Sequence, residues 1–182
     1  MQTTTPSLLA TKGAVILVQI QQWPHWEEIG KVALKEYGIT SEEYAKVLPE
    51  YQRFLTLVLL DTYPGLGMFS PRVDAIWHSH ILSTHRYQDF CEQYYQGRTI
   101  HHLPCLEPKP RNDCSTCNTC YECNATCDSG QKCPDELEYR EPEGPGAPGS
   151  LEHFQQAYRE VFGCEPPSVW NLPREKAEGF VG

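Results

Sequence analysis

The chain has 182 residues, 40% of them hydrophobic, and its 15 basic and 24 acidic side chains give a formal net charge of −9. This length and composition suit one folded domain with a single core plus an irregular segment. The acidic balance, without any lysine or arginine cluster, argues against nucleic acid as a partner. No apolar run approaches the roughly 20 residues that span a bilayer, and no secretion signal begins the chain, so we expect a cytoplasmic protein without a membrane partner.

Two segments near the N-terminus have helical or apolar character. Residues 7–20 form a short apolar run that fits either a buried helix or a strand. Residues 23–37 place apolar side chains at helical intervals, and Gly38 supplies a stop. The second segment is therefore predicted to be a helix.

A capping box opens the next predicted helix. Thr40 and Glu43 have the spacing of such a box, in which each side chain bonds to the backbone of the other residue. Pro49 is expected to break or kink this helix, so that a fresh helical run begins near Glu50. The apolar face of that run predicts the central helix of the core, with Tyr51, Phe54, Leu55, Val58 and Leu59.

The segment that follows is the richest in histidine. Ser70 and Pro71 are typical of an N-cap and a first helical residue, and no further proline or glycine occurs before Gly97. These features predict one helix of roughly 25 residues. Five of the seven histidines lie in this helix or just after it, which is a composition typical of a metal site.

Spacing on this helix selects the candidate ligands. Asp74, His78, Ile81 and His85 fall on one stripe, and the first two are one turn apart, so they can share a metal ion. His85 lies two turns from His78, a rise of roughly 10 Å, which is too far for both to chelate one ion. His80 lies roughly 200° around the axis from His78 and cannot bind the same ion.

The remaining ligands are expected from His101 and His102, because Gly97 ends the helix and lets the chain turn back. Adjacent residues of an extended segment point in opposite directions, so one of the two histidines is favoured. The resulting set is similar to two-histidine, one-carboxylate iron sites and to open zinc sites, and the metal is therefore zinc or iron. The alternative is structural: Asp74 also suits the helix dipole, and histidines beside tryptophan are often core residues.

Three motifs together suggest a family. They are YQRFLTL at residues 51–57, VDAIWHSHI at residues 73–81 and IHHLP at residues 100–104. This combination resembles the glycine-rich domain-containing protein-like family, and the resemblance covers most of residues 45–172. It implies a helix for the apolar run at residues 7–20, but it implies no reaction, because that family has no generally established one. The low-complexity tract is here cysteine-rich and acidic, so no role of a glycine-rich tail is carried over.

Six cysteines form a second candidate metal site: Cys114, Cys117, Cys120, Cys123, Cys127 and Cys133. Two C-x-x-C pairs suffice for a tetrahedral zinc site. The spacing from Cys117 to Cys127 also matches half of a bacterial ferredoxin motif, but Asp128 replaces the expected proline, so an iron–sulfur cluster is the alternative. A further alternative is that this segment binds no metal, or that its thiols form disulfides after isolation.

A final helix begins after the N-cap Ser150 and ends at Gly163, and it should dock back on the earlier helices. We therefore expect an all-α fold, a compact bundle of about five helices with an irregular cysteine-rich insertion. Residues 1–104 form the main helical domain, residues 105–149 the acidic insertion rich in cysteine, proline and glycine, and residues 150–182 the final helix and tail.

Three functions compete at this point. In a metalloenzyme, an ion on Asp74, His78 and His101 or His102 would activate water or dioxygen, with His80 or His85 as the catalytic proton shuttle. In a non-catalytic interaction module the metal would be structural, and the acidic tract would bind a partner. In a thiol-based protein of metal handling or redox sensing, the cysteines would act and the helices would be a scaffold. The partner is accordingly an unidentified small molecule or protein.

Overall fold

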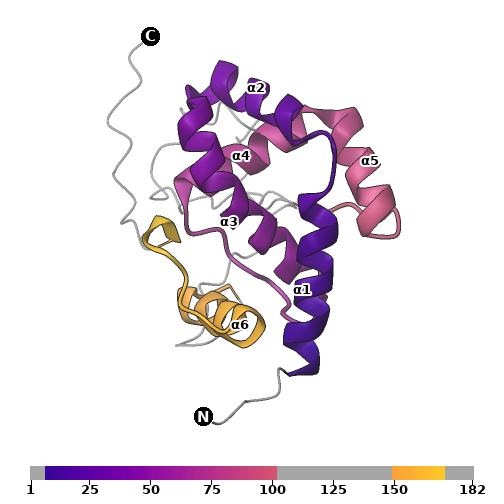
Figure 1. The fold of residues 1–182 in the computed structure, drawn as a ribbon, viewed down its shortest axis with the longest axis vertical. Coiled ribbons are helices and arrows are strands. Elements are labelled where there is room, and N and C mark those ends of the chain that lie inside the picture. The colour runs from indigo at the N-terminus through magenta and orange to yellow at the C-terminus, as the bar shows by residue number, and fades with distance from the viewer. Residues whose placement is uncertain (1–6, 102–148, 171–182) are drawn as a thin grey trace, which may run out of the picture. The chain divides into compact units, whose positions relative to one another are not determined.

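The computed structural model describes residues 7–101 and 149–170, and within these ranges it contains six α-helices, one short 3₁₀ helix and no strand (Figure 1). The predicted all-α fold is confirmed, including a helix for the ambiguous run at residues 7–20. The helices are α1 (Leu8–Gln21), α2 (Trp26–Tyr37), α3 (Ser41–Leu59), α4 (Pro71–Leu82), α5 (Thr84–Tyr94), α6 (Leu151–Phe162) and the 3₁₀ helix η3 (Ser168–Trp170).

Most helix boundaries lie where the sequence places capping residues. The side-chain oxygens of Thr40, Ser70 and Ser150 each accept a hydrogen bond from a backbone N–H in the first turn of the helix that follows. Gly38 and Gly163 end α2 and α6 with φ angles of 66° and 69°, in the left-handed region that glycine adopts without steric cost. These predicted starts and stops are confirmed.

Of the two outcomes predicted for Pro49, a break or a kink, the break is wrong, because α3 continues through this residue. A proline inside a helix removes one backbone hydrogen bond and usually costs about 3 kcal/mol. Here Tyr44 and Val47 before the proline, and Tyr51 and Phe54 after it, are all buried in the same core. Burial on both sides holds the helix together across the missing bond.

The predicted single helix from Pro71 to Gly97 is also wrong, because the chain leaves helical geometry at Ser83 (φ −82°, ψ 59°). The Ser83 hydroxyl donates to the carbonyl of Ser79 over 3.0 Å, but the hydroxyls of Thr56 and Ser79 make the same contact inside continuous helices, so this bond alone does not explain the break. Two separate helices, α4 and α5, result. The stripe through Asp74 and His78 therefore does not extend in a straight line to His85.

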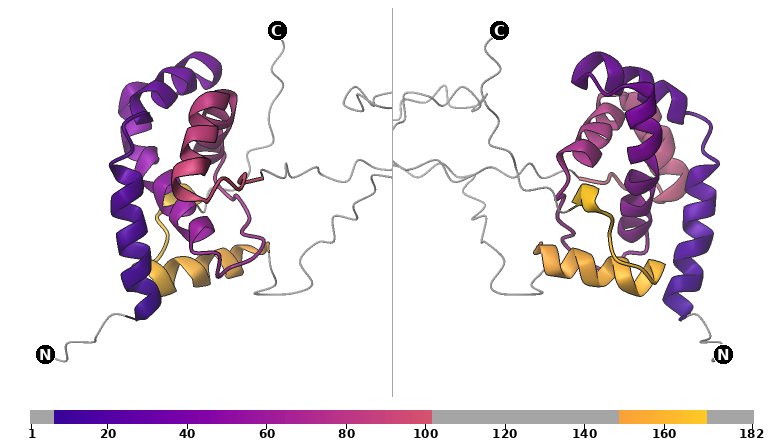
Figure 2. Two further views of the ribbon diagram at one scale, coloured as in Figure 1. Left: turned by 90° about the vertical axis from the view of Figure 1, so that its right-hand side faces the viewer. Right: turned by 60° about the vertical axis from the view of Figure 1, so that its left-hand side comes forward.

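Helix α3 is the centre of the core, as predicted, and it contacts α1, α2, α4 and α6 (Figure 2). Its buried side chains include Tyr51, Phe54, Leu55 and Leu57. The predicted core cysteine, Cys91 on α5, is buried too, and burial raises the pKa of its thiol.

None of the helices in the described ranges is both long and apolar enough to cross a membrane.

A buried carboxylate attaches the last described segment to α3. The Oε2 atom of Glu50 accepts hydrogen bonds from the Tyr158 hydroxyl of α6 and the Trp170 indole of η3, both over 2.8 Å. Its Oε1 atom lies 2.7 Å from the Arg53 guanidinium, which also donates to Tyr158. One side chain of α3 thus binds both α6 and η3.

Gly13 permits the close approach of α1 and α6, since a Cβ atom built on it would lie 2.4 Å from Cγ1 of Val161. We expect Gly13→Ala to lower the free energy of unfolding by about 1–2 kcal/mol, because the buried, stiff valine must move and the gain in helix propensity offsets only part of that cost. In a Val161→Ala background the same change should be neutral or stabilising. Urea denaturation of the four proteins tests this, and equal destabilisation in both backgrounds would contradict it.

The six cysteines from Cys114 to Cys133, and His102, lie outside the described residues. The predicted insertion at residues 105–149, its order and its metal content therefore stay predictions.

Candidate functional site

Asp74 and His78 form a carboxylate–imidazole pair on α4. Asp74 lies in the first turn of the helix and His78 one turn later, so their side chains project from the same side. The Nε2 atom of His78 lies 3.7 Å from Oδ2 of Asp74, and the two side chains are 40% and 33% exposed. This separation is longer than an ordinary N–H···O hydrogen bond. It is close to the roughly 3.4 Å between two ligand atoms that are each about 2.1 Å from one tetrahedral zinc ion.

A tyrosine of α2 borders the pair. The rings of Tyr37 and His78 meet edge to face with their centroids 6.1 Å apart. Burial raises the pKa of the Tyr37 hydroxyl, and the nearby carboxylates of Asp74 and Glu36 raise it further. At neutral pH this phenol is therefore protonated, and it can donate a hydrogen bond to a group bound at the pair.

The chain returns toward α4 just before His101. The Tyr87 hydroxyl donates to the backbone carbonyl of Ile100, and the Trp77 indole donates to Tyr87 over 3.4 Å. These contacts place Ile100 beside the helix that carries His78, while His101 itself is exposed. No three histidine, cysteine, aspartate or glutamate side chains within residues 7–101 and 149–170 gather closely enough to hold a metal ion. Asp74 and His78 therefore form a pair within these ranges, and the contribution expected from His101 or His102, of which His102 lies outside them, stays a prediction.

His80 occupies a different environment from His78. Its side chain is fully buried, and Nδ1 lies 2.9 Å from the Tyr51 hydroxyl. Nε2 is also buried and makes no hydrogen bond of good geometry within the described part of the chain. Five aromatic rings surround the imidazole at centroid distances of 5.0–6.0 Å: Trp23, Trp26, Tyr51, Tyr87 and Phe90.

The apolar environment of His80 determines the pKa of its imidazole. Burial lowers the pKa of the imidazole to about 3, and a weaker interaction with the Arg86 backbone opposes the shift. The ring is therefore neutral near pH 7. It lies on the buried side of α4, as the roughly 200° offset from His78 requires.

His85 is exposed and lies in a shallow depression at the start of α5, which Glu28, Leu82, Arg86 and Asp89 also line. This depression is a different place from the surface beside Tyr37 that carries the Asp74–His78 pair. The catalytic role predicted for His80 and His85 stays a prediction.

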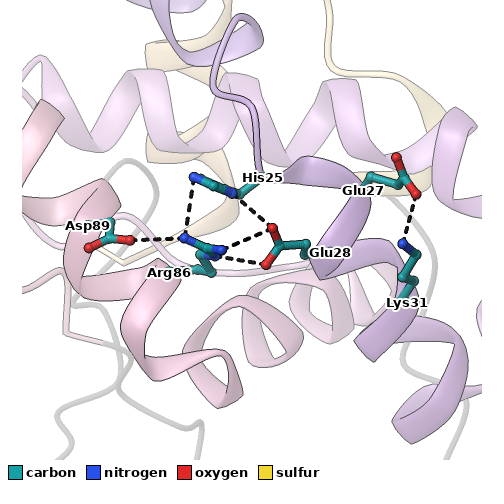
Figure 3. A network of polar contacts seen from close by, with 6 residues as sticks. All are labelled: His25, Glu27, Glu28, Lys31, Arg86 and Asp89. Atoms are coloured by element: carbon teal, nitrogen blue, oxygen red, sulfur yellow. Dashed lines mark hydrogen bonds and ion pairs between the residues drawn. The ribbon is translucent and has the colours of Figure 1, made fainter.

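Charged groups beside this depression join α2 to α5 (Figure 3). Arg86 of α5 makes two hydrogen bonds to the Glu28 carboxylate, over 2.8 and 3.1 Å, and lies 3.4 Å from Asp89. His25 lies 3.0 Å from Glu28 and 3.4 Å from Arg86. The arginine is satisfied by carboxylates of the same chain, so the network links two helices and its cation is already paired.

Three polar residues of these sites are absent from the expectations drawn from the sequence. Tyr37 belongs to the periodic face of α2, and its position beside His78 depends on how α2 and α4 pack. The sequence predicts Tyr51 only as a core residue. A buried tyrosine hydroxyl needs a hydrogen-bond partner, and this requirement could have predicted a polar neighbour in the core. Glu50 falls on the same helical stripe as Val47, Phe54 and Leu57, and a carboxylate in such a position indicates a buried polar contact.

The fold and these groups define an all-helical protein with a partly exposed carboxylate–imidazole pair on α4 and a neutral histidine in its core. Comparison with known families matches residues 17–138 to the UCP032817-like family, and the chain belongs to this family. The resemblance to the glycine-rich domain-containing protein-like family is therefore wrong, although the three motifs that suggested it all lie inside the matched region. No curated protein and no solved structure matches the chain.

Proposed function

We propose that the protein binds a zinc or iron ion through Asp74 and His78. The observation that carries this proposal is the 3.7 Å separation of the His78 Nε2 and Asp74 Oδ2 atoms, on a part of α4 that solvent reaches. One ion with ligand distances of about 2.0–2.2 Å can contact both atoms after a small side-chain rotation. The donor types, an imidazole and a carboxylate, suit both metals.

Two protein ligands leave coordination positions to be filled. His101 or His102 would supply a third ligand, and the second of these lies outside the described residues, as do the cysteines proposed for a second zinc or iron–sulfur site. An ion with one position left open would polarise a bound water or substrate, which is the basis of the proposed metal-dependent catalysis. The ring of Tyr37 meets that of His78, and its protonated hydroxyl would be available to orient such a group. We also propose a cytoplasmic location, where cysteines stay reduced and can bind metal.

Elemental analysis of protein purified without added metal tests this proposal. We expect about one zinc or iron ion per chain at the pair, in addition to any ion bound by the cysteines. His78→Ala should lose that ion, and a variant that lacks residues 105–149 should keep it. His153→Ala, which changes a partly exposed histidine of α6, is the matched control and should bind as much metal as the wild type.

Retention of all metal by His78→Ala, together with its loss from the variant without residues 105–149, would contradict the proposal and assign binding to the thiols. A wild-type protein that contains no metal and takes up none in a zinc titration would contradict it as well.

A further inference from the structure

Helix α5 covers the buried imidazole of His80. Tyr87 and Phe90 of α5 are buried, and their ring centroids lie 5.0 and 5.2 Å from that of His80. Trp23 and Trp26, before and at the start of α2, lie 5.0 and 5.6 Å from the same ring. The imidazole is 0% exposed, so bulk solvent does not reach it while α5 is in place.

One polar atom under this cover makes no hydrogen bond within the described part of the chain. Nδ1 of His80 lies 2.9 Å from the Tyr51 hydroxyl of α3, but Nε2 is buried and unpaired there. The ring also interacts weakly with the backbone of Arg86, in the first turn of α5. Buried polar atoms are almost always hydrogen-bonded, and an unpaired one costs the hydration free energy that contact with water would restore. The covered state therefore has a cost that hydration of Nε2 removes.

Helix α5 has fewer helical neighbours than the other core helices. Among the helices of the described ranges it shares an extended contact with α4 alone, whereas α3 contacts α1, α2, α4 and α6. The backbone at Ser83 is not helical, and its side chain makes no capping hydrogen bond to α5. The hydrogen bonds from Arg86 to the Glu28 carboxylate join α5 to α2 at a partly exposed position. Segments with few packed neighbours open at a lower free energy than the whole protein.

We propose that α5 is a lid, which opens about Ser83 and exposes His80 to solvent while the other helices stay folded. Opening gives up the ring contacts of Tyr87 and Phe90 with the imidazole and restores the hydration of Nε2, so the open form is a minor state in equilibrium with the closed one. The proposal does not depend on a metal ion at the Asp74–His78 pair.

Hydrogen exchange of the full chain in its native state tests the lid. In the wild type, the amides of α5 should be at least about tenfold less protected than those of α3. Between 0 and about 1 M urea their exchange should rise less than about twofold, because the opening exposes little surface, whereas exchange through global unfolding would rise roughly tenfold.

Arg86→Ala should speed exchange in α5 about fivefold and leave α3 unchanged, because it removes the hydrogen bonds to Glu28. Arg159→Ala is the matched control, since it removes an exposed ion pair with Glu165 at the end of α6. It should change exchange in α5 by less than about twofold.

A double variant, Tyr51→Phe with His80→Phe, tests the role of the unpaired nitrogen. It removes the imidazole and the hydroxyl bonded to it and keeps two rings in the core. The closed lid then covers no unpaired polar atom at this place, so the amides of α5 should exchange at least about fivefold more slowly than in the wild type.

Exchange in α5 that is as slow as in α3, and that responds to urea in the same way, would overturn the proposal, because only global unfolding would then expose His80. Equal effects of Arg86→Ala and Arg159→Ala would overturn it as well. Unchanged or faster exchange of α5 in the double variant would also overturn it, because the unpaired nitrogen would then not favour opening. Circular dichroism of each variant establishes that its helices are intact.

Discussion

Glu50→Ala should lower the free energy of unfolding by about 3–4 kcal/mol, the largest effect that we expect from a single substitution in this protein. The substitution removes the acceptor for the Tyr158 hydroxyl and the Trp170 indole and leaves Arg53 without its closest carboxylate. Two buried donors then lack partners, which costs more than the net value of the bonds themselves. Guanidinium denaturation measures the difference.

The loss should be concentrated in the segment that Glu50 attaches. Hydrogen exchange of α6 and η3 should accelerate more than exchange of α2 or α5, because α6 and η3 contain the two donors. Glu42→Ala is the matched control: it removes a carboxylate of the same helix that pairs with Lys46 at the surface, and it should leave stability nearly unchanged. Similar losses in both variants would show that the buried contacts of Glu50 are not special.

Acidification should destabilise the protein through His80. The pKa of this imidazole is about 3 in the folded protein and about 6.5 in the unfolded chain. Between these two pH values the unfolded state binds a proton at His80 and the folded state does not. The stabilisation due to the neutral ring is therefore complete above pH 6.5 and falls as the pH drops toward 3. Between pH 6.5 and pH 4 we expect a loss of roughly 3 kcal/mol from this residue.

A His80→Phe variant isolates this contribution. Phenylalanine fits among the surrounding aromatic rings but does not titrate, so the difference in stability between pH 6.5 and pH 4 should be smaller than in the wild type by the same roughly 3 kcal/mol. Its stability at pH 7 should be lower, because the Tyr51 hydroxyl loses its partner. Urea denaturation over this pH range, with His153→Ala as the control, measures both effects. Parallel pH profiles for wild type and His80→Phe would contradict the assignment.

The helical fold could be predicted because its signals are local. Ser70, Ser150 and Gly163 act within one turn of their own helix, so spacing alone identifies them. Pro49 and Ser83 show the limit of that approach. Whether a helix survives a proline depends on burial on both sides of it, and whether a helix ends at a serine depends on more than the contact of its hydroxyl, because Thr56 and Ser79 make the same contact as Ser83 inside continuous helices. Neither condition can be derived from neighbouring residues in the sequence.

The candidate site was predictable in part for the same reason. The proximity of Asp74 and His78 follows from helical spacing, and the separation of His80 from them follows from the same geometry. The environment of His80 does not, because its aromatic neighbours come from the loop before α2 and from α2, α3 and α5. The position of His101 depends on a long-range return of the chain, which spacing does not fix.

Anomalous diffraction at the zinc edge, from crystals of the zinc-loaded protein, tests the proposed metal site most directly. A peak should lie about 2.0–2.1 Å from a ring nitrogen of His78 and about 2.0–2.2 Å from a carboxylate oxygen of Asp74. Zinc peaks surrounded by cysteine sulfurs alone, with none between Asp74 and His78, would contradict the central claim.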